Sequence, residues 1–222
     1  MNVINLTPTL EPGREPKRLR HDLWIFPPNR DCNGGTAWWL DVDPEPVLID
    51  CPPVTEATLV FLNRAAGDRT PRIVLTSREG HGRLRRLQEA LRWPVLVQEQ
   101  EAYLLPNLQL LDTFAEAFTT LSGLQLLWTP GPTPGSCVLL APPPANLLFC
   151  GRLLTPLGPG CLGPIRQART FHWFRQLASV SRLRDWIPPE SSPELASGAA
   201  LGALKGGSLV PYSGWTPSPS LS

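Results

Sequence analysis

The chain has 222 residues, of which 42% are hydrophobic and 18% are charged, so it can bury a core of ordinary size. Its net charge of +1 excludes a global attraction to nucleic acid or to anionic lipid. Its 27 prolines and 18 glycines cut it into short elements, which excludes a helical bundle or a coiled coil. No apolar run approaches the ~18 residues of a membrane span, and Met1–Glu15 lacks the apolar core of a secretion signal. We therefore expect a soluble, loop-rich, single-domain protein.

The N-terminal half begins with a polar, proline-broken segment, 1–20, which we expect to form an extended arm. Turn residues at 33–35 and 43–46 then separate short apolar runs, and such runs predict strands. The predicted strands of this half are Leu23–Phe26, Thr36–Val42, Val47–Ile49, Arg72–Leu75 and Val95–Val97. Helices are predicted over Thr55–Arg64, with Thr55 as N-cap, and over the segment in which Leu84, Leu87 and Leu91 recur.

The C-terminal half repeats this alternation more loosely. Its predicted strands are Leu124–Trp128, Cys137–Leu140 and Asn146–Cys150. Thr170–Trp186 is the longest predicted helix, with a stripe formed by Phe174, Leu177, Ala178 and Ser181. From about Pro188 the composition shifts to Ser, Pro, Gly and Ala. We expect a domain over 21–204 and a flexible C-terminal tail over 205–222.

The five cysteines are widely spaced and form no CxxC pair. They stand at Cys32, Cys51, Cys137, Cys150 and Cys161. This pattern is neither a disulfide framework nor a zinc ribbon, so we expect buried thiols in a reducing cytoplasm. Cys150 stands near Arg152, and a cation can lower a thiol pKa, but its place on an apolar strand favours a packed thiol.

Four segments, in this order, resemble signatures of the metallo-β-lactamase superfamily. They are Val47–Asp50, Ile73–Thr76 with the loop and helix after it, Trp128–Ser136, and Leu148–Leu154. The third, Trp-Thr-Pro-Gly-Pro-Thr-Pro-Gly-Ser, is similar to the family's His-Thr-Pro-Gly-His-Thr-Pro-Gly-Ser. The resemblance covers roughly 23–186. It implies an α/β (α+β) fold, namely a single-domain αββα four-layer sandwich whose signature loops meet at one edge.

Three further segments resemble a cyanobacterial and plastid branch of that superfamily. They are Pro28–Ala37, Gln98–Pro106 and Thr170–Trp173. This second resemblance implies no particular activity for the chain.

The residues that the resemblance assigns to metal binding are almost all replaced. The four positions of the family's His-x-His-x-Asp-His loop hold Ser77, Glu79, His81 and Gly82. The ligand histidine of the second signature is Pro132, and the bridging aspartate is Arg152. Only Asp50 is unchanged, and the resemblance implies that this residue supports the loops rather than the metal. A hydrolytic zinc site needs about three protein ligands and a water, so the resemblance implies a vacated metal pocket, and we expect no cofactor.

From this pattern we predict a pseudoenzyme, a metal-free protein that works as a binding or assembly factor. Its ligand-binding pocket would be lined by Asp50, Ser77, Glu79, His81, Pro132 and Arg152. One alternative is a hydrolase of a small ester, thioester or phosphodiester, with a metal held by Asp50, Glu79 and His81. Another is a sensor in which Arg152 grips a carboxylate or phosphate. A Ser77–His81–Asp50 triad lacks the nucleophile-elbow sequence.

The arginine-rich segment after the first signature loop is a possible partner face. Arg83, Arg85 and Arg86, together with Trp173, could dock an acidic partner. Nucleic-acid binding is not expected, because Trp93 is the only aromatic residue near this cluster. The expected partner is thus an unidentified protein or a small anion.

Overall fold

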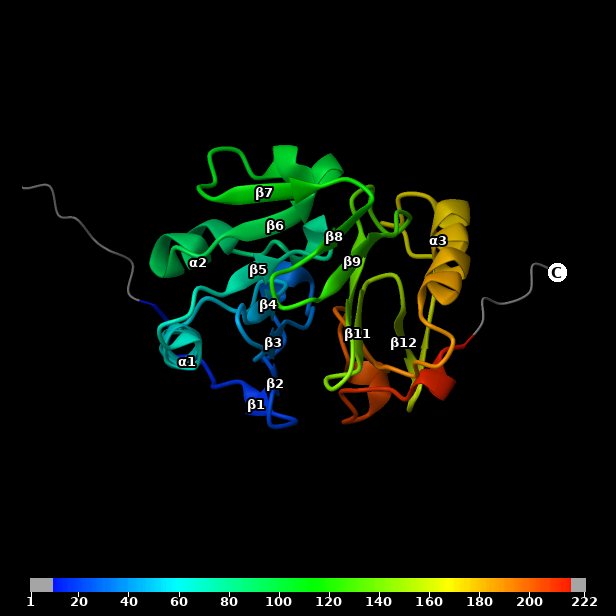
Figure 1. Ribbon diagram of the computed structural model, residues 1–222, viewed down its shortest axis with the longest axis horizontal. Coiled ribbons are helices and arrows are strands. Elements are labelled where there is room, and N and C mark those ends of the chain that lie inside the picture. Colours follow the sequence, from blue (N-terminus) through cyan, green and yellow to red (C-terminus); the bar gives the residue numbers. More distant parts are fainter. Residues whose placement is uncertain (1–9, 217–222) are drawn as a thin grey trace, which may run out of the picture.

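Two β-sheets lie face to face in this computed structural model, which describes residues 10–216 (Figure 1). The first sheet has the strand order β1-β2-β3-β4-β5-β6-β7. Its strands are Lys17–Arg18 (β1), Leu23–Ile25 (β2), Trp38–Leu40 (β3), Val47–Ile49 (β4), Arg72–Val74 (β5), Val95–Gln98 (β6) and Leu111–Phe114 (β7). Strands β1 to β4 pair antiparallel, whereas β4 to β7 pair parallel. The carboxyl ends of β4 and β5 therefore lie at the same edge.

The second sheet has the order β14-β11-β10-β9-β8. Its strands are Ala117–Thr119 (β8), Gln125–Trp128 (β9), Cys137–Ala141 (β10), Leu147–Gly151 (β11) and Glu194–Ser197 (β14). Strands β11 and β14 run parallel, and the other pairs are antiparallel. A separate hairpin consists of Thr155–Gly158 (β12) and Cys161–Gly163 (β13).

Helices cover the outer faces of both sheets. They are Glu56–Ala66 (α1), Leu84–Leu91 (α2) and Trp173–Trp186 (α3). Shorter 3₁₀ turns are Arg30–Cys32 (η1), Arg78–Gly80 (η2), Glu99–Leu104 (η3), Gly202–Leu204 (η4) and Tyr212–Gly214 (η5). Helices α1 and α2 lie on the first sheet, and α3 lies on the second, at the other end of the molecule (Figure 1). Among residues 10–216 no helix is long and apolar enough to cross a membrane.

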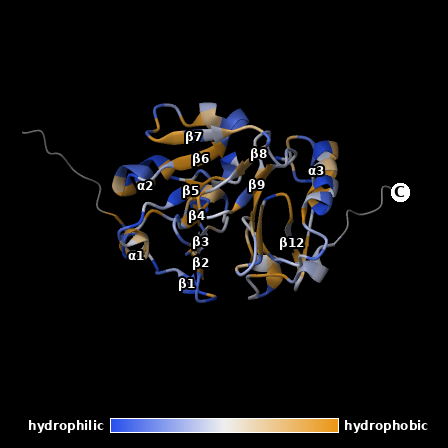
Figure 2. Ribbon diagram, in the orientation of Figure 1, coloured by the Kyte–Doolittle hydropathy of each residue, from blue (hydrophilic) through white to orange (hydrophobic). Residues whose placement is uncertain are grey.

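Three apolar clusters hold these layers together. In β4, Leu48 points into the cluster under α1 and α2, whereas Val47 and Ile49 point into the cluster between the sheets. This alternation follows from the two-residue period of a strand, and a strand buried on both faces is apolar throughout. The third cluster joins the second sheet to Val180 and Leu183 of α3. Figure 2 shows hydrophobic residues along β6 and β9 and hydrophilic ones over much of α2. The predicted αββα sandwich is confirmed.

The buried side of α3 differs from the predicted stripe. Gln176, Ser179, Val180 and Leu183 are its buried residues. Phe174 is 65% exposed, and Ala178 and Ser181 are exposed as well. The stripe prediction was wrong because it followed the largest apolar side chain, whereas the helix is oriented by Val180 and Leu183.

Both chain ends include segments that pack on the domain. The carbonyls of Glu11 and Pro12 accept hydrogen bonds from the first turn of α1, and β1 pairs with β2. In the segment predicted as a flexible tail, 205–222, Val210 pairs with Leu195 of β14 and Trp215 is 7% exposed. The packed part of the chain thus continues past the boundary predicted at 204. Residues 1–9 of the predicted arm and 217–222 of the predicted tail lie outside the described residues.

Candidate functional site

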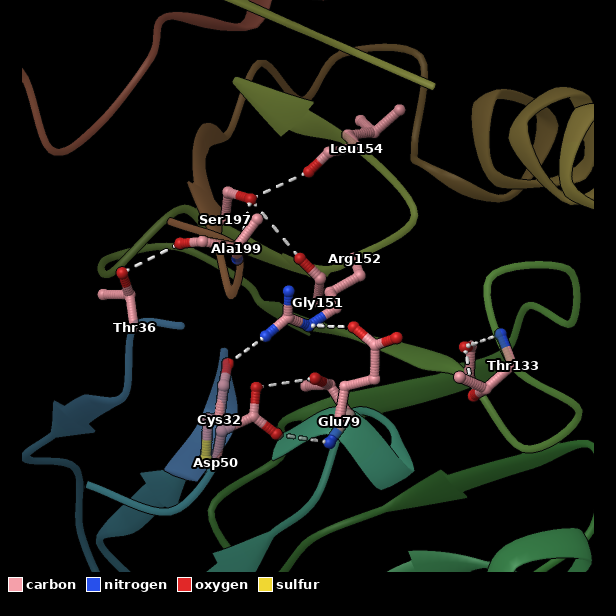
Figure 3. Close-up of polar contacts among 12 residues, drawn as sticks. Cys32, Thr36, Asp50, Glu79, Thr133, Gly151, Arg152, Leu154, Ser197 and Ala199 are labelled. Carbon is pink, nitrogen blue, oxygen red and sulfur yellow. Dashed lines mark hydrogen bonds and ion pairs between the residues drawn. The ribbon is translucent and has the colours of Figure 1, made fainter. Parts of the chain in front are cut away.

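The signature loops meet at one edge of the sandwich, where strands of both sheets end. Asp50 follows β4, Thr76 closely follows β5, and Arg152 follows β11. The two sheets are joined there, because the N–H of Cys137 in β10 donates to the Thr76 carbonyl at 2.8 Å. This edge brings together the four loops that the sequence resemblance placed at the site (Figure 3).

Asp50 braces the loops. Its Oδ1 accepts the backbone N–H of Thr76 at 2.8 Å, and its Oδ2 accepts the Thr76 hydroxyl at 2.7 Å. The residue adopts φ +59°, a left-handed conformation that Asp tolerates better than most residues. A Cβ on Gly80 would lie 2.3 Å from Asp50 Oδ1, so only glycine permits this approach. Burial raises the pKa of Asp50 to about 6, opposed by the Thr76 hydrogen bonds and by Arg152.

Arg152 occupies the centre of the site with an internal partner on each side (Figure 3). Its Nη2 donates to the Cys32 carbonyl at 2.6 Å, and its Nε lies 2.9 Å from Oε2 of Glu79. The Nε–H does not point directly at that oxygen, so the second contact is an ion pair without a well-formed hydrogen bond. The two side chains are only 11% and 16% exposed. Arg152 therefore links loops of both sheets.

Little open space remains at the pair itself. A cavity of about 20 Å³ is bordered by Glu79, Arg152, Pro132 and Gln176, and this volume is room for about one water molecule. An open groove of about 410 Å³ adjoins it. The groove is lined by Asn33, Glu79, Arg152, Thr155, Gln167 and Arg169, among others. The inner cavity is too small for an organic ligand, whereas the groove has room for a small molecule or for a protein side chain.

Ser77 and His81, the other two residues predicted in the pocket, lie in the η2 loop. The Ser77 hydroxyl is buried without a hydrogen-bond partner among the described residues, and so is Nε2 of His81. Burial, with a smaller effect of Arg78, lowers the pKa of His81 to about 4, so its imidazole is neutral at pH 7. No hydrogen bond or ion pair joins Ser77, His81 and Asp50 within residues 10–216, so the structure does not assemble them as a triad.

The loop between β9 and β10 is held by its own polar side chains. The Ser136 hydroxyl accepts the N–H of Thr133 at 2.9 Å, and the two hydroxyls lie 2.7 Å apart. The Pro132 carbonyl accepts the N–H of Phe171, which ties this loop to the segment before α3. Pro132 thus contributes a wall and a backbone acceptor to the site.

The donor set at this edge does not fit the metal that the fold family implies. No group of three or more His, Cys, Asp or Glu side chains is placed to hold a metal ion in the described part of the chain. Both carboxylate oxygens of Asp50 are taken by Thr76, and Glu79 faces a guanidinium. A guanidinium is a permanent cation and brings charge of the wrong sign to a cation site. We therefore derive no step through a metal.

The predicted partner face is not one surface. Arg83 pairs with Asp31 at 2.9 Å, and Arg85 donates to the Pro106 carbonyl at 2.7 Å. Arg86 borders a groove with Arg83 beside the N-terminal arm. Trp173 opens α3, which lies in the opposite outer layer from α2 (Figure 1). The structure therefore separates Trp173 from the three arginines.

Several residues of the site escaped the sequence reasoning. Gln176 is 1% exposed, and its side-chain amide donates to the Leu153 carbonyl at 3.2 Å. Gln167 and Arg169 line the groove from the loop before α3. No motif marks any of the three. A cysteine carbonyl as the partner of Arg152 is also invisible in a sequence, because every residue carries that group.

The comparisons with known proteins concern the fold. No family model matches the chain, and no curated protein matches it significantly in sequence. Among solved structures, the B3 metallo-β-lactamase BLEG-1 is 21% identical, with a TM-score of 0.65 over 86% of this chain and 94% of that one. A metallo-β-lactamase from Pontibacter korlensis is 19% identical, with a TM-score of 0.65 over 90% and 94%. The di-iron-bound form of TTHA1623 is 24% identical, with a TM-score of 0.60 over 81% and 91%. Together with the layers described above, these similarities establish that the chain has the metallo-β-lactamase fold.

Proposed function

We propose that this protein is a metal-free, non-catalytic member of the metallo-β-lactamase fold that acts as a binding or assembly factor. The observation that supports this proposal most directly is the placement of Arg152. Its guanidinium is ion-paired with Glu79 and hydrogen-bonded to the Cys32 carbonyl. The sequence resemblance assigns position 152 to a metal-bridging aspartate. A salt bridge there fastens loops that a metal would otherwise hold together.

The shape of the site supports binding of a partner over binding of a small anion. Arg152 already has two internal acceptors, so a free phosphate or carboxylate would have to compete with Glu79. The inner cavity of about 20 Å³ is too small for such an ion with its ligands, whereas the groove of about 410 Å³ is open to solvent. A protein segment laid in the groove meets the polar side chains of Gln167 and Arg169.

Two narrower assignments belong to this proposal. The cyanobacterial and plastid branch is supported by the three segments quoted above and by the replaced ligand positions. A cytoplasmic location is supported by the cysteines, because all five lie in the described residues as free thiols.

Melting temperatures of Arg152→Ala test the internal role of the arginine. Removal of the guanidinium leaves the mostly buried carboxylate of Glu79 without its ion-pair partner. We therefore expect a loss of about 3 kcal/mol in the free energy of unfolding. The double variant Glu79→Gln with Arg152→Met should recover part of that loss, because no charge is then left unpaired.

The same melting experiment is repeated with millimolar phosphate and acetate. We expect neither anion to shift the wild-type melting temperature. A variant that is as stable as the wild type, combined with an anion-induced shift that only the wild type shows, would contradict the proposal in favour of an anion sensor.

A further inference from the structure

An exposed row of aromatic rings lies beside the groove, where the chain enters α3. Phe171 is 49% exposed and Phe174 is 65% exposed, and the ring of His172 lies between them, with its centroid 6.4 Å from each. Single exposed apolar residues are ordinary, but neighbouring aromatic rings outside the core are typical of interaction sites.

The fold does not need these rings. At about 100° per residue, Phe174 lies about 160° around the helix from the buried Gln176, so it faces away from the sheet. The third apolar cluster is completed by Val180 and Leu183 without either phenylalanine.

Arginines without an ion-pair partner among residues 10–216 flank these aromatic residues in the sequence. Between Glu116 and Asp185 the sequence has no acidic residue but has six arginines, Arg152, Arg166, Arg169, Arg175, Arg182 and Arg184. Three of them are engaged, Arg152 with Glu79, Arg182 with Glu116 and Arg184 with the Trp215 ring. Arg166, Arg169 and Arg175 are exposed and make no ion pair within residues 10–216. We call Phe171, His172 and Phe174 with these three arginines the aromatic–arginine surface.

Backbone hydrogen bonds fix this surface in place. The N–H groups of Phe171 and His172 donate to the carbonyls of Pro132 and Gly131 at 3.0 and 2.9 Å. In the loop that carries two of the arginines, the N–H of Thr170 donates to the Gln167 carbonyl, and the Thr170 hydroxyl accepts the N–H of Gln167 at 2.9 Å. A preorganised surface loses less conformational entropy when it binds.

We propose that the aromatic–arginine surface docks an acidic peptide segment of a partner protein. Carboxylates of the segment would pair with the guanidinium groups of Arg166, Arg169 and Arg175, because arginine recognises carboxylates with two parallel hydrogen bonds. An aromatic or aliphatic side chain of the segment would cover Phe171 and Phe174. Arg169 also lines the groove over Glu79 and Arg152, so the segment can continue into it.

Charge favours a protein segment over a membrane or a nucleic acid. Recognition of anionic lipid uses clusters of four to eight basic residues, and nucleic-acid grooves follow a continuous cationic track. This surface has three arginines that make no ion pair within the described residues, in a chain whose net charge is +1. The inference rests on the proposed function and names the class of its partner.

The test is selection from a random dodecapeptide display library on the full-length protein, followed by fluorescence anisotropy with the enriched peptides. We expect enrichment of acidic peptides that contain Phe, Leu or Trp. The double variant Arg169→Glu with Arg175→Glu should bind them at least about tenfold more weakly, which equals about 1.4 kcal/mol. Phe174→Ser should also bind these peptides more weakly. The matched control Arg64→Glu, on α1 in the opposite outer layer, should bind them like the wild type.

Three outcomes would overturn the inference. They are enrichment of neutral or basic peptides, undiminished binding by the double variant, and preferential binding to phosphatidylglycerol vesicles or short oligothymidine. Circular dichroism of each variant checks that it is folded. If the peptides bind Arg152→Ala more weakly but bind the double variant like the wild type, their binding site is the groove. The proposed function would then still hold, whereas this inference would not.

Discussion

At the scale of single residues, hydrogen bonds and one ion pair join the loops of the site. Both carboxylate oxygens of Asp50 accept hydrogen bonds from Thr76. The Arg152 guanidinium donates to the Cys32 carbonyl and forms an ion pair with Glu79. Each contact joins segments that are far apart in the sequence. At position 152, which the sequence resemblance aligns with a metal-bridging aspartate, an arginine joins loops of both sheets.

Two buried groups at this edge give opposite contributions to the pH dependence of stability. The pKa of Asp50 is raised from 3.8 to about 6, so between these values the folded chain holds a proton that the unfolded chain releases. Its contribution to stability therefore grows as the pH falls from 6 to 4. The pKa of His81 is lowered from 6.5 to about 4, so the unfolded chain takes up a proton before the folded chain does as the pH falls. The contribution of His81 to stability is therefore lost as the pH falls from 6.5 to 4.

Substitutions should separate these two contributions. Asp50→Asn keeps the left-handed conformation and an acceptor for the Thr76 N–H, so we expect it to fold and to lose more stability than the wild type between pH 6.5 and 4. His81→Asn should lose less than the wild type over that range. The difference in melting temperature should be on the order of 5 °C in each direction. Parallel melting curves of all three proteins across this range would contradict the assignment.

At the scale of elements, apolar runs and helical periodicity predicted their strands and helices correctly. The apolar runs of β4, β6, β10 and β11 and the helices α1 and α2 lie where the sequence predicts them. The strands of 2–4 residues at β1, β7, β8, β12, β13 and β14 were missed. These strands are ordered by pairing with neighbours distant in sequence, such as β14 with β11. Polar residues, proline or glycine interrupt them, so they lack the continuous apolar run that marks β4 or β11.

The same limit applies to the site. The family signatures predicted which loops meet, because the fold that the resemblance implies brings those loops to one edge. They did not predict the contribution of α3, since Gln176 and the groove residues Gln167 and Arg169 belong to no motif. Nor did they predict the outward orientation of Phe174, because large apolar side chains are usually buried.

The second signature loop approaches the backbone of α3 closely at Gly131. This residue has φ +144°, and a Cβ on it would lie 2.3 Å from the Cα of Gln176. We expect Gly131→Ala to lower the free energy of unfolding by about 3 kcal/mol, since both strain and a backbone clash arise. In the control Gly158→Ala the new methyl group meets nothing within 4 Å, and the change should stay within about 0.5 kcal/mol. Equal effects of the two substitutions in urea denaturation would contradict this packing.

At the scale of the whole molecule, two sheets and three apolar clusters form one unit that includes the segment after residue 204. Val210 pairs with Leu195, and Trp215 packs edge-on against Tyr212 with the Arg184 guanidinium 5.0 Å from its ring. The second sheet and α3 are thus closed by residues that sequence composition assigned to a tail.

The substitution Trp215→Ala measures how much the segment after residue 204 contributes to the stability of the fold. Loss of a large buried side chain should lower the free energy of unfolding by about 3 kcal/mol. Leu121→Ala, at a side chain that is 76% exposed, serves as the control and should change it by less than about 0.5 kcal/mol. Urea denaturation that gives Trp215→Ala the stability of the wild type would place the segment outside the cooperative unit.

The central claim is that an internal salt bridge has taken over the role of the metal centre, and elemental analysis tests it most directly. Untagged protein, purified without chelators and then incubated with zinc, iron or manganese, is desalted and its metal content is measured. We expect well under one equivalent of each metal, because position 152 is a cation and Asp50 is bound to Thr76. A near-stoichiometric metal content that is lost in Glu79→Ala or His81→Ala would contradict the claim and make the chain a candidate metalloenzyme.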